Sequence, residues 1–168
     1  MIVDSHCHLD RLDLSAHKLS LSQLLAQARA RGVEGFLCVC ISEANKNAVL
    51  SIAEEYDSVV ASVGVHPSDV KDTPISVDTL IQWAQSPKVV ALGETGLDYY
   101  YSAEFAHQQK ESFKNHLLAG AQLKLPVIVH TRQAQQDTLE LMRTYADRES
   151  AGVMHCFTED WAMAEQAL

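Results

Sequence analysis

The sequence predicts an α/β fold with a parallel sheet of the (β/α) TIM-barrel type, comprising about six of the eight βα units of such a barrel. Short apolar, β-branched runs alternate with amphipathic helical stretches, which is typical of repeated βαβ units. The runs are almost continuously apolar, so the sheet should be covered on both faces. Polar residues follow nearly every predicted strand, which favours a barrel over an open doubly wound sheet, because barrel enzymes place their chemistry on that rim.

Start and stop signals place each element in order. Three helices are expected to begin at capping serines, Ser20, Ser42 and Ser76, and Gln23 can complete a capping box with Ser20. Pro126 stands at the start of a strand, where its missing amide costs least. The predicted strands are residues 1–8, 35–41, 59–65, 89–94, 127–130 and 152–157. The predicted helices are residues 20–32, 42–56, 76–85, 103–124, 133–147 and 160–168.

Composition and charge narrow the function classes. The 168 residues are 47% hydrophobic and 21% charged, as in an ordinary globular domain. The longest apolar run, residues 36–41, is too short to cross a membrane, and the N-terminus lacks a signal-peptide pattern, so we expect a cytoplasmic protein with no membrane partner. A formal net charge of −9 argues against a basic face that holds duplex DNA. The spacing of Cys38 and Cys40 fits no zinc or redox motif, so the cysteines are interpreted as free thiols.

Histidines and one glutamate stand at the ends of predicted strands. His6 and His8 are two residues apart, so their side chains would leave the same strand face and could bind one ion. Glu94 ends an apolar strand, in which a carboxylate is costly to bury without a cation, and His130 and His155 end similar strands. Imidazole and carboxylate ligands suit zinc, manganese or iron, and a carboxylate can bridge two ions. The pattern predicts a binuclear hydrolytic site; alternatively, these groups satisfy one another in a polar barrel mouth.

Other polar residues on the same rim have two interpretations each. His66, at a strand end before a proline, is either a metal ligand or a donor that positions substrate. Asp98 could orient a metal ligand from behind or cap a loop. Arg132 could contact a phosphate, although a surface ion pair is the more common role. The run of Tyr99, Tyr100 and Tyr101 could stack on bases or pack against the following helix. The remaining histidines are interpreted as structural or solvated: His17, His107 and His116.

These residues lie in five segments that together resemble the TatD family of metal-dependent deoxyribonucleases, a branch of the amidohydrolase superfamily. The resemblance runs along the whole chain, and the order of the segments makes it specific. The segments are Asp4-Ser5-His6-Cys7-His8-Leu9-Asp10, Gly64-Val65-His66-Pro67, Gly93-Glu94-Thr95-Gly96-Leu97-Asp98-Tyr99, Pro126-Val127-Ile128-Val129-His130-Thr131-Arg132 and His155-Cys156-Phe157-Thr158.

The resemblance implies a barrel with two divalent ions, which could be zinc, manganese or magnesium. It implies His6 and His8 on the first ion, a bridging Glu94, and a second ion on the two remaining ligands, His130 and His155. It also implies that His66 positions substrate, so that Glu94 and His66 are the expected catalytic residues. The implied reaction is hydrolysis of phosphodiester bonds by metal-activated water, often from the 3′ end of DNA. Because the chain is acidic, an end or a single strand is the expected substrate.

One feature of the family is not found in the sequence. Family members have a further strand that ends in an acidic motif, whose aspartate completes the first metal site, and a complete barrel needs about 250 residues. We therefore expect residues 1–168 to be the N-terminal part of one barrel domain. Two alternatives stay open: a hydrolase of a small ester, lactone or amide, and an inactive or metal-binding chain that lacks the catalytic aspartate. The sequence makes no prediction of the oligomeric state.

Overall fold

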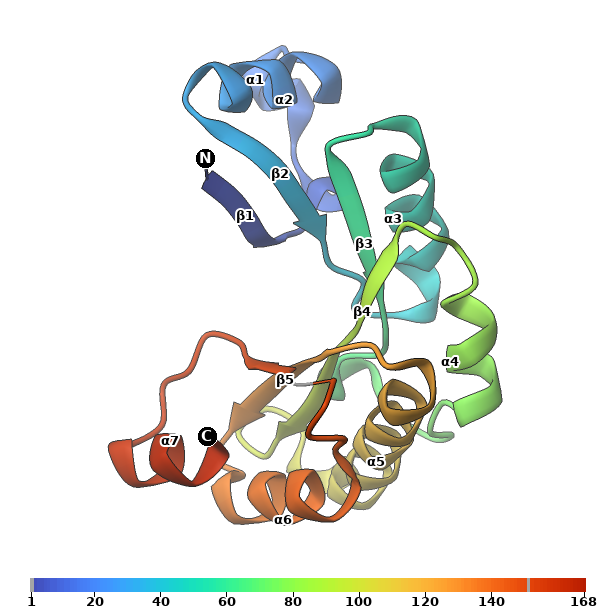
Figure 1. Cartoon of the computed structure of the whole chain (residues 1–168), viewed down its shortest axis with the longest axis vertical. Coiled ribbons are helices and arrows are strands. Elements are labelled where there is room, and N and C mark those ends of the chain that lie inside the picture. The colour runs from blue at the N-terminus through green and yellow to red at the C-terminus, as the bar shows by residue number, and fades with distance from the viewer. Residues whose placement is uncertain (1, 151) are drawn as a thin grey trace.

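A six-stranded parallel sheet forms the centre of the structure, a computed structural model that describes residues 2–150 and 152–168. The strands follow one another in chain order, and each pairs in parallel with its neighbours, so the predicted fold class is confirmed. The sheet curls into a half-barrel (Figure 1). The strands are β1 (Ile2–Cys7), β2 (Val33–Cys38), β3 (Val59–Val63), β4 (Val89–Asp98), β5 (Val127–Arg132) and β6 (Gly152–Met154).

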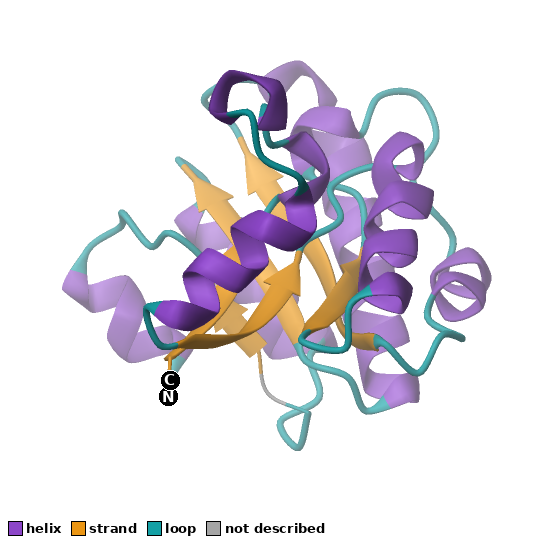
Figure 2. Ribbon diagram, turned by 90° about the horizontal axis from the view of Figure 1, so that it is seen from above, coloured by secondary structure: helices purple, strands orange, loops and turns teal. Residues whose placement is uncertain are grey.

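Helices connect the strands and surround them, as Figure 2 shows from above. Figure 1 shows α3, α4 and α5 along the outer side of the curled sheet, while both ends of the chain lie on its open side. Within the described ranges, no helix is long and apolar enough to cross a membrane. The α-helices are α1 (Leu14–His17), α2 (Leu21–Ala30), α3 (Glu43–Glu55), α4 (Val77–Trp83), α5 (Ala106–Leu123), α6 (Gln135–Tyr145) and α7 (Trp161–Ala167). Short 3₁₀ helices are η1 (Leu9–Arg11), η2 (Pro67–Asp69) and η3 (Ala103–Phe105).

The three predicted serine caps are confirmed. Ser20 accepts a hydrogen bond from the amide of Gln23, whose side chain returns the bond, so the capping box is complete. Ser42 forms a second capping box with Asn45, and Ser76 caps α4. The sequence did not predict η1 and α1, which lie in the stretch that joins β1 to α2.

Several strand bounds differ from the prediction. β1 ends at Cys7, so His8 lies beyond the strand, and Met1, the predicted start, lies outside the described residues. β2 begins two residues before the predicted Gly35, and β6 ends at Met154. β4 runs four residues past Glu94 to Asp98, because Gly96 lets its backbone approach β5 closely. At Gly96 the φ angle is +134°, and a Cβ would lie 2.0 Å from the carbonyl oxygen of His130.

Alternate residues of the strands enter two apolar clusters. The large cluster lies between the sheet and the outer helices, where Leu92 and Val129 pack with residues of α5 such as Phe113. A small cluster contains Ala91 and Ile128, which are the sequence neighbours of these strand residues and so face the other side of the sheet. This alternation fixes the register of the strands. Because all six strands are parallel, their carboxyl ends lie along one rim.

Candidate metal centre

Glu94 lies in the middle of the rim cluster and is nearly buried, with 5% of its surface exposed. It belongs to β4 and follows Gly93, to which it is joined by a cis peptide bond. Its two carboxylate oxygens face different histidines. Oε2 lies 3.2 Å from Nε2 of His6 in β1, and Oε1 lies 3.3 Å from Nδ1 of His130 in β5. A single carboxylate thus joins ligands from strands on either side of β4.

The charge of Glu94 is stabilised by these neighbours. Burial by itself would raise the pKa of the carboxyl group, but the side chains of His130 and His6 outweigh burial and hold the pKa well below its usual range. The same contact works in the other direction at His130. Burial lowers its pKa, and the carboxylates of Glu94 and Asp98 overcome that effect and raise it. The carboxyl group of Glu94 is therefore ionised and is able to bind a cation.

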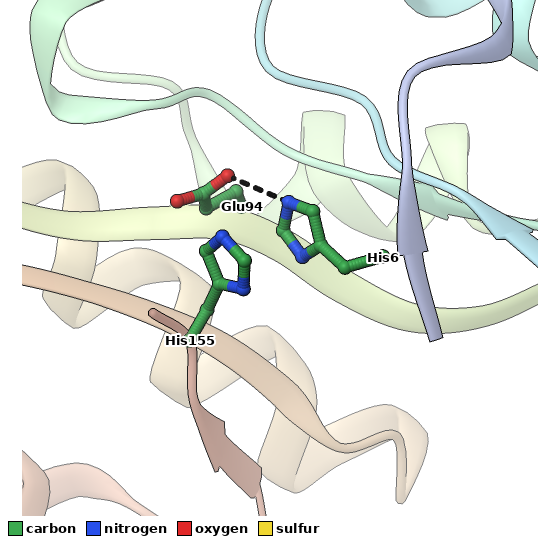
Figure 3. A group of neighbouring side chains, drawn as sticks. All are labelled: His6, Glu94 and His155. Atoms are coloured by element: carbon green, nitrogen blue, oxygen red, sulfur yellow. Dashed lines mark ion pairs between the residues drawn. The ribbon is translucent and has the colours of Figure 1, made fainter. Parts of the chain in front are cut away.

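The potential ligand atoms fall into two groups of three that share Glu94. One group contains His6 and His155 with Glu94, and the other contains His66 and His130 with Glu94. Within each group the ligand atoms lie within 4.8 Å of one another. Figure 3 shows the first group, in which the rings of His6 and His155 approach Glu94 together. These distances suit groups that could converge on an ion.

The surroundings of His6 and His155 fit a role as metal ligands. The His6 and His155 rings stack with their centroids 3.4 Å apart and nearly parallel, and burial together with His6 lowers the pKa of His155. Nε2 of His6 is buried and has no hydrogen-bond partner of good geometry in the described residues. A buried ring nitrogen whose contact with a carboxylate is poorly aligned leaves part of its hydrogen-bonding capacity unused, which is costly. A divalent ion would satisfy it, because neutral imidazole nitrogen is a preferred ligand of such ions.

His8 lies outside both groups, although it stays next to His6. Their ring centroids are 5.3 Å apart. Nδ1 of His8 lies 3.1 Å from the carbonyl oxygen of Val39, so this nitrogen carries the proton and donates, while Nε2 is left as an acceptor. Histidines that bind metals usually donate their other ring nitrogen to a carbonyl or carboxylate in this way.

Asp98 provides the corresponding contact for His130. Its Oδ2 lies 3.1 Å from Nε2 of His130, which fixes the ring with Nδ1 toward Glu94. The carboxylate of Asp98 is itself fixed, because its Oδ1 accepts the amides of Tyr100 and Tyr101. Asp98 therefore combines the two roles that the sequence left open, orientation of a histidine and capping of a loop.

The protonation of His66 is set by a local hydrogen bond and by burial. It lies just beyond β3, and its Nδ1 accepts a hydrogen bond from the amide of Ser68. Because a backbone amide can only donate, the proton of the neutral ring is on Nε2, which points toward Oε1 of Glu94 at 3.8 Å. Burial lowers the pKa of His66 to about 4, so the ring is neutral at pH 7. An N–H at this position is a hydrogen-bond donor rather than a metal ligand.

The groups differ in two respects from the pairing that the family resemblance implies. His6 contacts His155 rather than sharing a group with His8, and His66 stands beside His130 where the resemblance implies His155.

Arg132 forms no ion pair with a carboxylate in the described part of the chain, so the surface ion pair is not found. Its guanidinium instead lies over two tyrosine rings.

Two buried residues of α5 support the site, and sequence analysis did not select them for it. Gln109 donates to the carbonyl oxygen of Asp98 and accepts from its amide. His116 accepts the amide of Val65, which precedes His66. Their sequence signal was limited to polar residues on a helix face that is mostly apolar, and the contacts that they make form only in the folded protein.

Fold and site together define a member of the (β/α)-barrel class whose rim carries a histidine–carboxylate cluster suited to divalent metal ions. The model of the TatD related DNase family matches residues 3–168. The chain belongs to this family.

Relatives and solved structures agree with that assignment. The chain is 45% identical to the uncharacterized metal-dependent hydrolase YcfH of Escherichia coli K12, over 99% of this chain and 63% of that protein. It is 33% identical to the 3′-5′ ssDNA/RNA exonuclease TatD of Salmonella typhimurium, over 80% of this chain and 52% of that protein. The crystal structure of YjjV, a TatD homologue from E. coli K12, superposes with a TM-score of 0.83 at 26% identity, over 98% of this chain and 63% of that one. The chain thus spans about 63% of the length of YcfH.

Proposed function

We propose that residues 1–168 form the first six βα units of a single barrel domain whose activity is metal-dependent hydrolysis of phosphodiester bonds in single-stranded nucleic acid, starting from the 3′ end. The observation that carries the proposal is the position of Glu94, which directs one oxygen toward His6 and the other toward His130. A relative named as a 3′-5′ ssDNA/RNA exonuclease supports the choice of substrate. The net charge of −9 also favours a strand end drawn to bound cations over a clamped duplex.

The proposed metal ligands are His6, His8, Glu94, His130 and His155. Glu94 would be shared by two sites: His6, with His8 next to it, would hold one ion together with Glu94, and His130 would belong to the other site. His155 completes the set, since its ligand atom lies within 4.8 Å of those of Glu94 and His6. When bound, two divalent ions supply Lewis acidity, which polarises a phosphoryl group and makes water a nucleophile at neutral pH.

The protein's own residues orient the substrate and the ligands. His66 would donate its Nε2–H to a phosphate oxygen, because its tautomer is fixed by the Ser68 amide and its low pKa keeps the ring neutral. Asp98 holds the ring of His130 so that Nδ1 stays directed at the cluster. Arg132, on the same rim, is proposed to contact the phosphate of a bound strand.

The test is hydrolysis of labelled single-stranded DNA in the presence of Mn²⁺. Cleavage from the 3′ end should shorten a 5′-labelled oligonucleotide one step at a time and release a 3′ label as a mononucleotide at the outset. EDTA and the substitution Glu94→Gln should each abolish the reaction, whereas Glu54→Gln, at an exposed position of α3, should not affect it.

The same preparations separate the alternatives. If phosphodiesters stay intact while an aryl ester or a lactone is hydrolysed in a manner that needs both metal and Glu94, the chain is a hydrolase of small esters. If no substrate turns over but Mn²⁺ is bound, the protein is a metal-binding chain without catalytic activity.

A further inference from the structure

Two exposed tyrosines and an arginine form a cluster beside the metal centre, which we call the tyrosine–arginine platform: Tyr100, Tyr101 and Arg132. The tyrosine side chains are 54% and 65% exposed, and their rings contact edge to face with centroids 4.6 Å apart. The guanidinium of Arg132 lies 4.3 Å from the Tyr100 centroid and 4.7 Å from the Tyr101 centroid. Single exposed tyrosines are common, but two exposed rings in contact form an aromatic surface of the kind that marks binding sites.

The platform is connected directly to the metal centre through Asp98. One oxygen of Asp98 accepts the amides of Tyr100 and Tyr101, at 3.0 and 2.8 Å, while the other contacts His130 at 3.1 Å. Asp98 is also the partner of Arg132 in the register between β4 and β5. Because Arg132 follows His130 by two residues in β5, both side chains leave the same face of the sheet. The platform is therefore the next surface outward from the metal centre.

The turn that carries the tyrosines is held in place by buried hydrogen bonds. The side-chain amide of Gln109, which is fully buried, donates to the carbonyl and the hydroxyl of Ser102, each at 2.9 Å. The same side chain accepts a hydrogen bond from the amide of Asp98 and donates one to its carbonyl oxygen. A turn fixed in this way loses little conformational entropy when it binds a ligand.

Packing within the protein does not account for the platform. Tyr99, the first of the three tyrosines, is half-buried and donates its hydroxyl to Asp137, so it has a structural role. Tyr100 and Tyr101 instead present their rings to solvent, and Arg132 has no carboxylate partner in the described residues. An arginine that stacks on a ring keeps its N–H groups free along its edge, where they can bind a phosphate in bidentate fashion.

We propose that the tyrosine–arginine platform is a subsite for an unpaired nucleotide of a single-stranded nucleic acid, with the base stacked on a tyrosine ring and a phosphate on Arg132. The inference rests on the proposed function, since it places the strand that the metal centre would cleave. Stacking on an aromatic ring tolerates any base, and a single well-placed guanidinium lets a strongly acidic protein bind an anion locally. Both DNA and RNA offer these two groups.

The test is the affinity of fluorescein-labelled oligothymidylate and oligouridylate of about ten nucleotides, measured by fluorescence anisotropy in EDTA. Replacing both tyrosines by alanine (Tyr100→Ala/Tyr101→Ala) should weaken binding at least about fivefold, since stacking contributes roughly 1–3 kcal/mol per base. The Tyr100→Phe/Tyr101→Phe protein retains the rings and should bind like the wild type. Arg132→Gln should weaken binding and lower the slope of log K against log salt by about 0.7, the value for one phosphate contact. Arg31→Gln, at an exposed position after α2, is the matched control for charge and should do neither.

Each result decides the proposal separately from the hydrolysis assay, because binding is measured without metal. A wild-type protein that binds neither oligonucleotide, alanine substitutions that do not affect affinity, or equal losses for Arg132→Gln and Arg31→Gln would each overturn the subsite. Binding that depends on the platform without any hydrolysis in Mn²⁺ would support the subsite and contradict the proposed function.

Discussion

The buried histidine of α5, His116, should make the stability of the protein depend on pH. Its side chain is fully buried, its Nε2 accepts the amide of Val65 at 3.1 Å, and its Nδ1 donates to the carbonyl oxygen of Ser112 at 2.7 Å. Both hydrogen bonds need the neutral ring, because the amide of Val65 can only donate. Burial lowers the pKa of His116 from its ordinary value of 6.5 to about 4.

The size of the effect follows from the two pKa values. A depressed pKa in the folded state means that the unfolded chain binds more protons between pH 6.5 and about 4. His116 therefore has no influence on the slope above pH 6.5, and stability is lost as the pH falls from 6.5 toward 4. The pKa values differ by about 2.5, and each pKa unit corresponds to about 1.4 kcal/mol, so the loss amounts to about 3 kcal/mol.

The substitution His116→Leu removes this dependence. At pH 7 the variant should be less stable by about 1–3 kcal/mol, because the amide of Val65 loses its buried acceptor. As the pH falls to about 4, only the wild type loses stability through the buried neutral ring, so the free energies of unfolding of the two proteins should converge. The measurement is urea unfolding followed by circular dichroism in EDTA at several pH values. His107→Leu, at an exposed position of the same helix, serves as the control and should follow the wild type. A difference between wild type and His116→Leu that stays constant from pH 7 to pH 4 would refute the reasoning.

Three further predictions concern the metal centre and the sheet. The double substitution His6→Ala/His8→Ala should remove about one of the two bound Mn²⁺ equivalents proposed above, as measured by elemental analysis; full retention would contradict the ligand assignment. Asp98→Asn keeps the shape but loses the charge that orients a histidine, so Mn²⁺ affinity should fall about 10–100-fold in competition with a chelating dye, and an unchanged Kd would count against that role. Gly96→Ala should lower the free energy of unfolding by at least about 1–3 kcal/mol, because the φ angle of Gly96 is +134°. Gly35→Ala should be nearly neutral, because a Cβ there would have no neighbour closer than 3.6 Å. Equal melting temperatures for the two variants would refute this difference.

The rim position of the candidate ligands could be predicted because it depends only on strand ends. Apolar runs end just before Glu94 and His130, and His6 follows a shorter apolar run after two polar residues. The carboxyl ends of parallel strands meet along one edge whatever the details of packing. The family resemblance then indicated which of these residues bind metal and in which order they follow along the chain. The fold class followed from the same alternation of strands and helices.

The rest depends on contacts between segments that are distant in the chain. The tautomer of His66 is set by a local turn, but its low pKa comes from burial that forms only in the folded protein. The apolar run predicted a strand end at Glu94, whereas Gly96 permits close approach to β5 and β4 continues to Asp98. The contact of His116 with the site could not be predicted from sequence, because its partner Val65 lies 51 residues earlier, in the loop after β3.

The stacked rings of His6 and His155 have a consequence for folding as well as for chemistry. His6 belongs to β1 and His155 directly follows β6, and these first and last strands of the described sheet are its two edges and pair with no common strand. An ion held by both would act as a cross-link that closes almost the whole chain into one loop, and long loops are those for which closure removes most entropy from the unfolded state. Binding to the folded state alone adds about 2.7 kcal/mol when the free ion is at a hundredfold excess over its Kd. Chelation should therefore loosen β1 and β6 first and leave the central strands protected, so that amide exchange at the two edges becomes a direct readout of metal occupancy.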